Sequence, residues 1–503
     1  MYKPTEQQIT FPHEFFLPFG GNLNPDNKWC KLALMIPWAE VEKKYARSFP
    51  VSRGQKAYSV RLALGSLIIQ NVKSLSDRDT VEEITENPYM QYFIGLSAFV
   101  DKPPFNHSLM THFRKRLDKD IINEINEITS RLAGEHEYPE NPDDLDDPDD
   151  SDGSDDTPPS DGEDSDDTGQ EEKTNEEPSE TKNSGKLILD ATCTPADIHY
   201  PTDIWLLNTT RQALEEIIDV LHAPHAGILK KPRSYRRNAR KSYLNIDKKK
   251  HKTAKMIRKG IGGQLRYIRR DLKNIKTLAE KSSLTLLTKR QYRNLLVSQE
   301  IYRQQLEMYK QGKHSVEDRI VSLHMPFVRP IVRGKSNADV EFGAKLAISV
   351  VNGFSYMESL SFDAFNESKT LMQSVENYYQ RYGFYPEAVM ADKIYRNRDN
   401  LNYCKKLGIR LSGPPLGRPA KDQELLREQK KQERLDAGIR NAVEGKFGEG
   451  KRFYGLGRIM ARLKETSETV IAMQLLVMNL ERRLRILILN FIRENFGLIR
   501  LAY

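Results

Sequence analysis

An acidic stretch with almost no apolar residues divides this chain into two parts. Between Glu137 and Glu180 there are 21 acidic residues and one base, Lys173, which gives a local net charge of −20. Such a sequence cannot bury enough apolar surface to offset the entropy lost on ordering. We therefore expect a disordered linker here, with folded parts before and after it.

The remaining residues carry a large positive charge that the acidic stretch conceals. Because the whole chain has a formal charge of +8 and the stretch contributes −20, the rest carries +28. A surplus of that size over folded parts favours a polyanionic partner, above all nucleic acid.

Other classes of protein fit the sequence poorly. The three cysteines (Cys30, Cys193 and Cys404) are widely spaced and have no histidine at metal-ligand spacing, so neither a disulfide scaffold nor a structural zinc site is expected. The apolar stretch from 470 to 492 is interrupted by the charged run ERRLR, which predicts a buried helix rather than a membrane span. The N-terminus has no signal-peptide pattern, and we expect a cytoplasmic protein.

The part before the acidic stretch is predicted to be helical. Apolar residues recur at helical spacing over 58–72 and 77–84, and a further helix is expected to begin at Ser108. This last helix carries Arg114 and Arg116 on its early turns. A DNA-binding helical module and an ordinary helical bundle both fit this pattern.

After the acidic stretch, strand-like segments alternate with helical ones. Apolar residues 187–189 form a short predicted strand that ends at Asp190, and a second buried strand ends at Asp392. Between them, 327–334 and 340–362 are also strand-like, the latter with a turn at Asn352-Gly353. Apart from one long helical insertion, this order predicts an α/β fold with an RNase H-like mixed sheet.

The helical insertion is strongly basic. From Lys230 to Lys276 there are 19 Lys or Arg residues and two acids, with Tyr235, Tyr243 and Tyr267 among them. Cations beside aromatic rings can neutralise phosphates and stack on bases. We therefore expect this segment to contact nucleic acid.

Asp190 and Asp392 are candidates for metal ligands. Phosphoryl transfer on DNA uses two divalent ions, and hard cations such as Mg²⁺ prefer carboxylate oxygens. The predicted fold places the ends of these two strands side by side. Taken singly, an aspartate at the end of a strand is more often a turn former or helix cap.

Glu444 is the candidate third acid. Arg440, Glu444 and Lys451 lie four and seven residues apart, so that on a helix they share one face. A carboxylate flanked by two cations suits a metal ligand beside bound phosphate. The alternative is an exposed i,i+4 ion pair, which is common and contributes little.

These motifs together resemble the bacterial insertion-sequence DDE transposases, in the InsH-like group with an N-terminal helical DNA-binding domain. The resemblance is carried by LSDRDTVEEITENPYMQYFIGL and FNHSLMTHFRKRL before the acidic stretch. After it, LILDAT, RPIVRGK, VEFGAKLAISVVNGF, VMADKIYRN and RNAVEGKFGEGKRFYGLGRI are similar in content and order.

The resemblance also implies roles for individual residues. The family's signature of tyrosine, arginine, glutamate and lysine matches Arg440, Glu444 and Lys451, while Ala437 stands at its tyrosine position. In the segment RPIVRGK, it favours DNA contacts for the basic residues, which are Arg329, Arg333 and Lys335.

The sequence predicts four successive regions. Residues 1–135 form an all-α DNA-binding domain and 136–184 the acidic disordered linker. An RNase H-like catalytic core spans 185–465, with the basic helical insertion at about 205–320, and a C-terminal helix occupies 466–503.

The function implied by the resemblance is that of a DNA transposase. It frees a 3′-hydroxyl at each end of its element and joins it to target DNA by two-metal phosphoryl transfer, with two Mg²⁺ ions or Mn²⁺ in their place. The expected partners are double-stranded DNA, as terminal repeats and as target, and a second copy of the chain. The expected location is the nucleoid of a bacterial cytoplasm, with no membrane. The alternatives are an RNase H-like nuclease that cuts without joining, and an inactive DNA-binding protein derived from a transposase.

Overall fold

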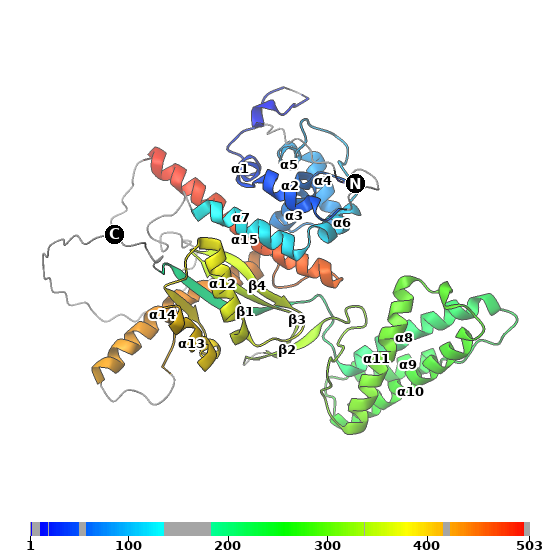
Figure 1. Ribbon diagram of the computed structural model, residues 1–503. Coiled ribbons are helices and arrows are strands. Elements are labelled where there is room, and N and C mark those ends of the chain that lie inside the picture. The colour runs from blue at the N-terminus through cyan, green and yellow to red at the C-terminus, as the bar shows by residue number, and fades with distance from the viewer. Residues whose placement is uncertain are drawn as a thin grey trace, which may run out of the picture.

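The computed structural model describes Tyr2 and residues 11–18, 20–49, 57–134, 183–335, 338–415 and 423–496. Within these ranges the chain is a mixed α/β protein (Figure 1). Helices from both ends of the chain lie together above a mixed sheet, and a bundle of helices projects to one side. The predicted acidic linker lies outside the described residues, except for Asn183 and Ser184.

The residues before the acidic stretch form short helices. They are α1 (Lys28–Met35), α2 (Trp38–Ala46), α3 (Val60–Lys73), α4 (Asp77–Glu86), α5 (Pro88–Phe93), α6 (Leu109–Arg116) and α7 (Lys119–Gly134). The single helix predicted from Ser108 is in fact two. Leu117 has a non-helical ψ of 73°, and the Asp118 carboxylate then accepts a hydrogen bond from the Ile121 amide, which starts α7.

The sheet has six strands with the order β2-β3-β1-β5-β6, and β4 pairs with β3. The strands are β1 (Lys186–Pro195), β2 (Arg329–Lys335), β3 (Ala338–Val351), β4 (Phe354–Ser361), β5 (Ala388–Ala391) and β6 (Arg410–Leu411). β1 is antiparallel to β3 and parallel to β5. The predicted turn joins β3 to β4, and both of its residues, Asn352 and Gly353, have the positive φ that a tight hairpin needs.

The helices after β4 cover the sheet and join it to the N-terminal helices. They are α12 (Leu371–Tyr382), α13 (Arg398–Lys406), α14 (Gln423–Phe453) and α15 (Lys464–Phe496). Residues 471–480 of α15 are all buried, and α15 packs against α3, α6, α7 and β4. One hydrophobic core therefore includes the N-terminal helices, α15 and one face of the sheet. In the described residues, no helix is both long and apolar enough to cross a membrane.

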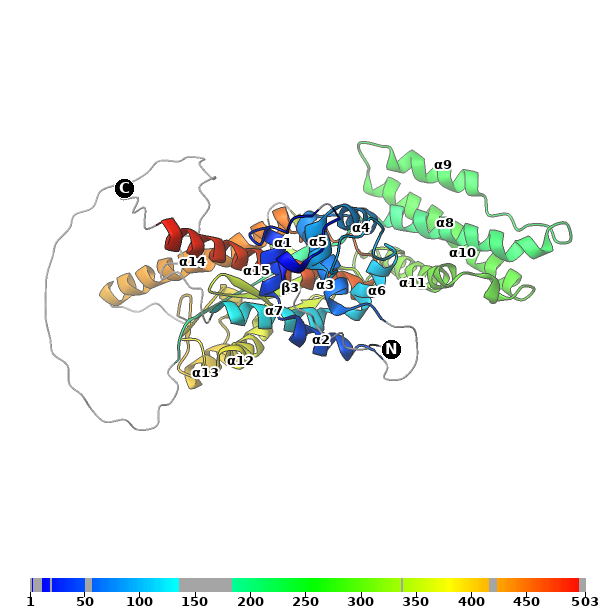
Figure 2. The same ribbon diagram turned by 90° about the horizontal axis from the view of Figure 1, so that it is seen from above.

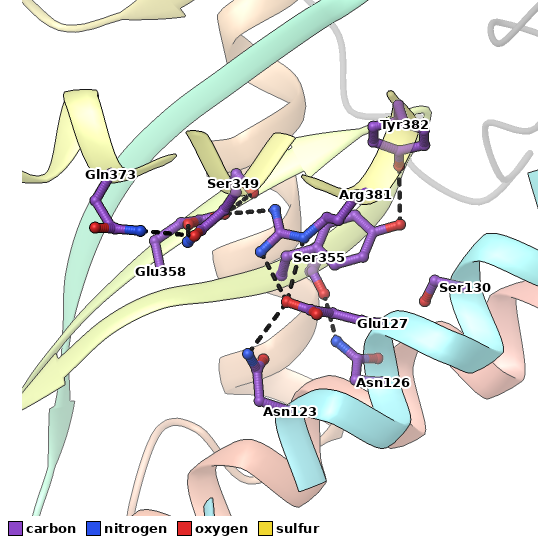
Figure 3. Close-up of polar contacts among 12 residues, drawn as sticks. Asn123, Asn126, Glu127, Ser130, Ser349, Ser355, Glu358, Gln373, Arg381 and Tyr382 are labelled. Atoms are coloured by element: carbon purple, nitrogen blue, oxygen red, sulfur yellow. Dashed lines mark hydrogen bonds and ion pairs between the residues drawn. The ribbon is translucent and has the colours of Figure 1, made fainter. Parts of the chain in front are cut away.

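A buried cation reinforces this junction (Figure 3). The guanidinium of Arg381 on α12 lies 2.8 Å from Glu358 on β4 and 3.0 Å from Glu127 on α7. Burial alone would lower the pKa of Arg381, but the two carboxylates raise it above its ordinary value. The ion pairs thus hold a helix from before the acidic stretch against two elements from after it.

Asparagine side chains add a second buried link at the same junction. Asn479 of α15 donates to the side-chain oxygen of Asn126 and to the backbone carbonyl of Ser355, each at 2.8 Å, and accepts from the Ser355 amide. Asn126 donates to the same carbonyl. These bonds satisfy polar groups that would be costly to bury unpaired, and they require α7, α15 and β4 to meet in one arrangement.

Between β1 and β2 the chain forms a bundle of helices, which we call the arm. It contains α8 (Asp203–His222), α9 (Arg236–Asp247), α10 (Ala254–Ala279) and α11 (Lys289–Gln311). Figure 2 shows the arm extending away from the sheet. Its helices pack around their own hydrophobic cluster, which includes Leu207, Leu214, Ile217 and Ile268.

The interior of the arm also holds charged side chains. Arg211 and Glu215 on α8 form a buried ion pair, and Arg236 on α9 bonds the carbonyl of Glu215. Asp271 on α10 is fully buried, and both of its carboxylate oxygens lack a hydrogen-bond partner. Burial, and then the charge of Glu215, raise the pKa of Asp271 from 3.8 to about 7. Its neutral form is therefore the one that the arm accommodates.

Cutting the chain within the acidic stretch is expected to leave its two parts associated. If a protease site replaces residues 150–160, the cleaved fragments should elute together on gel filtration, because they share a hydrophobic core and the Arg381 ion pairs. Separation of the fragments in the absence of denaturant would contradict this.

The same cleaved protein can measure the contribution of Arg381. Arg381→Met leaves Glu358 buried without its cation, so the fragments should separate at a lower urea concentration. The free energy that holds them together should fall by about 3–5 kcal/mol. Arg303→Met, which removes an exposed ion pair on the arm, is the control and should leave the urea midpoint unchanged.

Asp271 is expected to make the thermal stability of the chain depend on pH. Its pKa is about 7 in the folded arm and about 3.9 when unfolded, so the folded state binds the proton more tightly. The free energy of unfolding should thus fall as the pH rises from about 4 to about 7, and then level off. Asp271→Asn removes this loss.

The measurement is the melting temperature of the variant minus that of the wild type, across the pH range. The difference should increase up to about pH 7 and stay constant above it. The control is Asp247→Asn, which removes an exposed carboxylate from α9. A difference for Asp271→Asn that does not change with pH would show that the arm does not favour the protonated acid.

Candidate active site

Asp190 and Asp392 lie beside each other because of the strand register. β1 and β5 are parallel, and Leu189 is opposite Ala391, so that the next residue along each chain is an aspartate. Asp190 is partly buried within β1, whereas Asp392 follows the end of β5 and is more exposed. One oxygen of each carboxylate accepts the amide of the following residue at 2.7 Å. In the described residues, no hydrogen bond to the second oxygen of either carboxylate is observed.

Helix α14 brings a cation and a third acid to this pair. α14 packs against β1 and β5. From it, the guanidinium of Arg440 lies 4.0 Å from the Asp392 carboxylate and 3.3 Å from that of Glu444. Arg440 thus lies between the two carboxylates, and the predicted sharing of one helical face by Arg440 and Glu444 is observed.

The surroundings of Asp190 destabilise its negative charge. Burial raises the pKa of Asp190, and the nearby carboxylates of Glu367 and Asp392 raise it further, while Arg440 opposes them. A carboxylate that is destabilised in this way gains from any additional cation nearby.

Glu367 was not predicted from the sequence. It begins the 3-10 helix η5 (Glu367–Thr370) after β4, and Lys345 of β3 holds its carboxylate at 2.9 Å. Lys345 also donates to the carbonyl of Phe365. Asn366, which caps η5, was a local signal for a turn, but nothing in the sequence links this turn to Asp190.

The donor set suits a hard divalent cation, although the carboxylates do not already form a complete cage. Asp190, Asp392 and Glu444 offer only oxygen donors, which Mg²⁺ and Mn²⁺ prefer. In the described part of the chain, no three acidic, histidine or cysteine side chains are close enough to hold one ion as they stand. Glu444 points to Arg440, so it would have to turn toward the aspartates to join them.

The other residues predicted to contact phosphate lie at the end of α14 and on β2. Lys451 lies two turns after Glu444, in the last turn of α14. Arg329, at the start of β2, donates to the backbone carbonyls of Pro326 and Val328 and lies 3.7 Å from an exposed carboxylate. Arg333 and Lys335 belong to β2, but their side chains are not among those described.

The two N-terminal arginines differ in their surroundings. Arg114 is mostly buried and forms a bidentate pair with Asp77, with its closer contact at 2.6 Å. Arg116 is exposed, lies over the ring of Phe49 and donates to a backbone carbonyl. Arg116 is thus the more accessible of the two, and Arg114 also supports the packing of α6 on α4.

Two protein-family models match the chain. Residues 389–481 match a family described as "Transposase DDE domain", a range that contains Asp392, Arg440 and Glu444. Residues 19–116 match a family described as "Transposase domain (DUF772)", which ends at Arg116. Asp190 lies outside both matched ranges.

A curated protein from Rhizobium meliloti, "Uncharacterized protein ORF8 in nfe locus", is 36% identical to the chain over 104 residues. The match covers 20% of this chain and 49% of that protein, so the chain spans about half the length of this relative. No solved structure matches the chain.

Proposed function

We propose that this chain, which its two transposase domains assign to the insertion-sequence DDE transposases, cuts DNA at the ends of its element and joins the freed 3′-hydroxyls to target DNA. The observation that carries the proposal is the pair of adjacent carboxylates, Asp190 and Asp392, joined through Arg440 to Glu444 on α14. We further infer that it belongs to the InsH-like group of this family.

The sheet supports an RNase H-like core as the scaffold of this reaction. Its central part has the order β4-β3-β1-β5-β6, in which three antiparallel strands are followed by two parallel ones. The first aspartate lies on the central strand and the second at the end of its parallel neighbour. The helical arm enters between β1 and β2 and leaves this order intact.

Each residue of the site has a distinct task in the proposed reaction. Asp190, Asp392 and Glu444 would hold two divalent ions, Mg²⁺ or Mn²⁺, which activate the attacking oxygen and neutralise the leaving oxygen. Arg440 would move from the carboxylates to the scissile phosphate, because its charge is needed less once cations arrive. Lys451 would hold a neighbouring phosphate.

The partners follow from this chemistry. The substrate is double-stranded DNA, bound as the element's terminal repeats and as target. Arg116, and Arg114 once released from Asp77, are the proposed contacts of the N-terminal helices, and Arg329, Arg333 and Lys335 those near the sheet. Because two element ends must be cut together, we propose that the active form is a homodimer on DNA. The proposed location is the bacterial nucleoid.

Removal of any one carboxylate should abolish cleavage without loss of DNA binding. We expect Asp190→Asn, Asp392→Asn and Glu444→Gln to reduce cleavage of plasmid-borne element ends by at least about a thousandfold, since each removes metal-ligand charge. Asp399→Asn and Glu428→Gln change exposed acids on α13 and α14 and should retain activity.

Strand transfer from pre-cut ends distinguishes the alternatives. A chain that cuts but joins nothing would be a nuclease without strand transfer. A wild-type chain that binds element ends and does neither would be an inactive relative. Full activity in any of the three carboxylate variants would contradict the site.

Arg440 offers an independent test, because it is proposed to hold phosphate rather than metal. Arg440→Gln should bind Mn²⁺ at least as tightly as the wild type, as measured by electron paramagnetic resonance, since a competing cation is gone. Cleavage should nevertheless fall by roughly a hundredfold. Weaker Mn²⁺ binding in this variant would contradict the assignment.

A further inference from the structure

One face of α10 carries two groups of cations, separated by residues 260–265, where Gly262 packs against Tyr309. Eight exposed basic residues fall within a sector of about 120° on the helix, opposite its buried side. They are Lys255, Arg258, Lys259, Arg266, Arg269, Arg270, Lys273 and Lys276. Asp271 is the only acid between the first and the last of them, and it is buried on the other side. We call these eight residues the α10 basic face.

In the parts of the chain that the structure describes, no ion pair involves any of the eight side chains. The outer face of α11 differs, because Arg303 there is paired with Glu300 and Glu307. On α11 at least one arginine is therefore neutralised by neighbouring acids, whereas none of the eight α10 cations forms such an ion pair in the described residues.

The aromatic rings near this face are already engaged. Arg270 lies over the rings of Tyr235 and Tyr267, and Arg258 lies over Tyr309. Tyr243, which the sequence offered as a stacking residue, is buried inside the arm. A surface that offers charge rather than free rings suits the backbone of a duplex better than the bases of a single strand.

The face runs from the base of the arm toward its tip. Gly260 packs against Ile204, near the start of α8 and so near the end of β1. Ser282, just beyond α10, donates to the carbonyl of Leu221 near the end of α8. From Lys255 to Lys276 the helix is about 32 Å long, close to the roughly 34 Å of one turn of duplex DNA.

We propose that the α10 basic face binds the phosphate backbones of duplex DNA over about one helical turn, so that DNA is held along the arm as well as at the carboxylates. This inference rests on the proposed function, because a DNA substrate is what makes the duplex the relevant polyanion. It assigns the sequence-independent part of DNA affinity to one surface of one helix.

The test compares two triple substitutions with the same charge change, each on one face of a helix at positions separated by multiples of seven residues. The first is Lys259→Gln, Arg266→Gln and Lys273→Gln on the α10 basic face. The control is Lys289→Gln, Arg303→Gln and Lys310→Gln on the outer face of α11. All six positions are exposed, so both full-length variants should fold, as a circular dichroism melt will check.

Binding is measured without divalent metal, to a duplex of unrelated sequence of about 30 base pairs, roughly three turns. Between about 50 and 200 mM salt, the α10 variant should lose about 2 to 3 units of the slope of log K against log salt, since each phosphate contact contributes about 0.9. Its affinity at the lower salt should fall at least about tenfold. The control should lose less than about one unit.

An α10 variant with an unchanged slope, or one that lowers it no more than the α11 control, would overturn the inference. So would a larger loss of affinity for single-stranded DNA than for duplex. Because no metal is present, these outcomes are independent of catalysis. If the α10 substitutions weaken duplex binding as expected but the wild-type protein cuts no element ends, only the proposed reaction is overturned.

Discussion

The arrangement of this protein depends on one buried charge, the guanidinium of Arg381. Only 5% of its side chain is exposed, so it requires both carboxylates that face it, and leaving such a charge unpaired costs about 3–5 kcal/mol. Glu358 comes from the sheet and Glu127 from the helices before the acidic stretch. Hydrophobic contacts alone would allow several packing arrangements. The Arg381 ion pairs and the Asn126–Asn479 contacts select one of them. The N-terminal helices therefore stay in a defined position relative to the sheet, without a covalent linker of any particular length.

A fixed sheet in turn fixes the candidate site. Asp190 and Asp392 could be recognised in the sequence because each ends a short apolar run, and parallel pairing brings such ends together. Arg440 and Glu444 were visible because four residues make one helical turn. Their approach to the aspartates was inferred from the family resemblance, since no local pattern says where α14 packs. Glu367 was missed for the same reason: its partner Lys345 lies on a different strand, and only the fold brings the two near Asp190.

Other features were hidden because they depend on contacts between distant residues. Glu127 and Arg381 are 254 positions apart, and nothing in either neighbourhood indicates a buried ion pair. Inside the basic insertion, the sequence showed three tyrosines among many cations, but not that Tyr243 packs inward or that Arg270 covers the other two. The break between α6 and α7 at Leu117 was masked by apolar spacing that continues through it. Periodicity shows which side of an element is apolar, and it does not show which partner covers that side.

The structure separates the charge that would bind DNA from the charge that would act on it. The proposed site at Asp190, Asp392 and Glu444 is acidic and would repel phosphate unless cations neutralise it, and in the described part of the chain Arg440 is the cation that lies near two of these carboxylates. The α10 basic face lies on an arm with its own core, so its attraction for a polyanion does not compensate those carboxylates directly. If cations were instead clustered around the aspartates, they would pair with them and weaken the affinity for metal. Because the α10 basic face lies on the arm, its cations do not pair with these carboxylates, so the proposed DNA binding and the proposed metal binding are compatible in one chain.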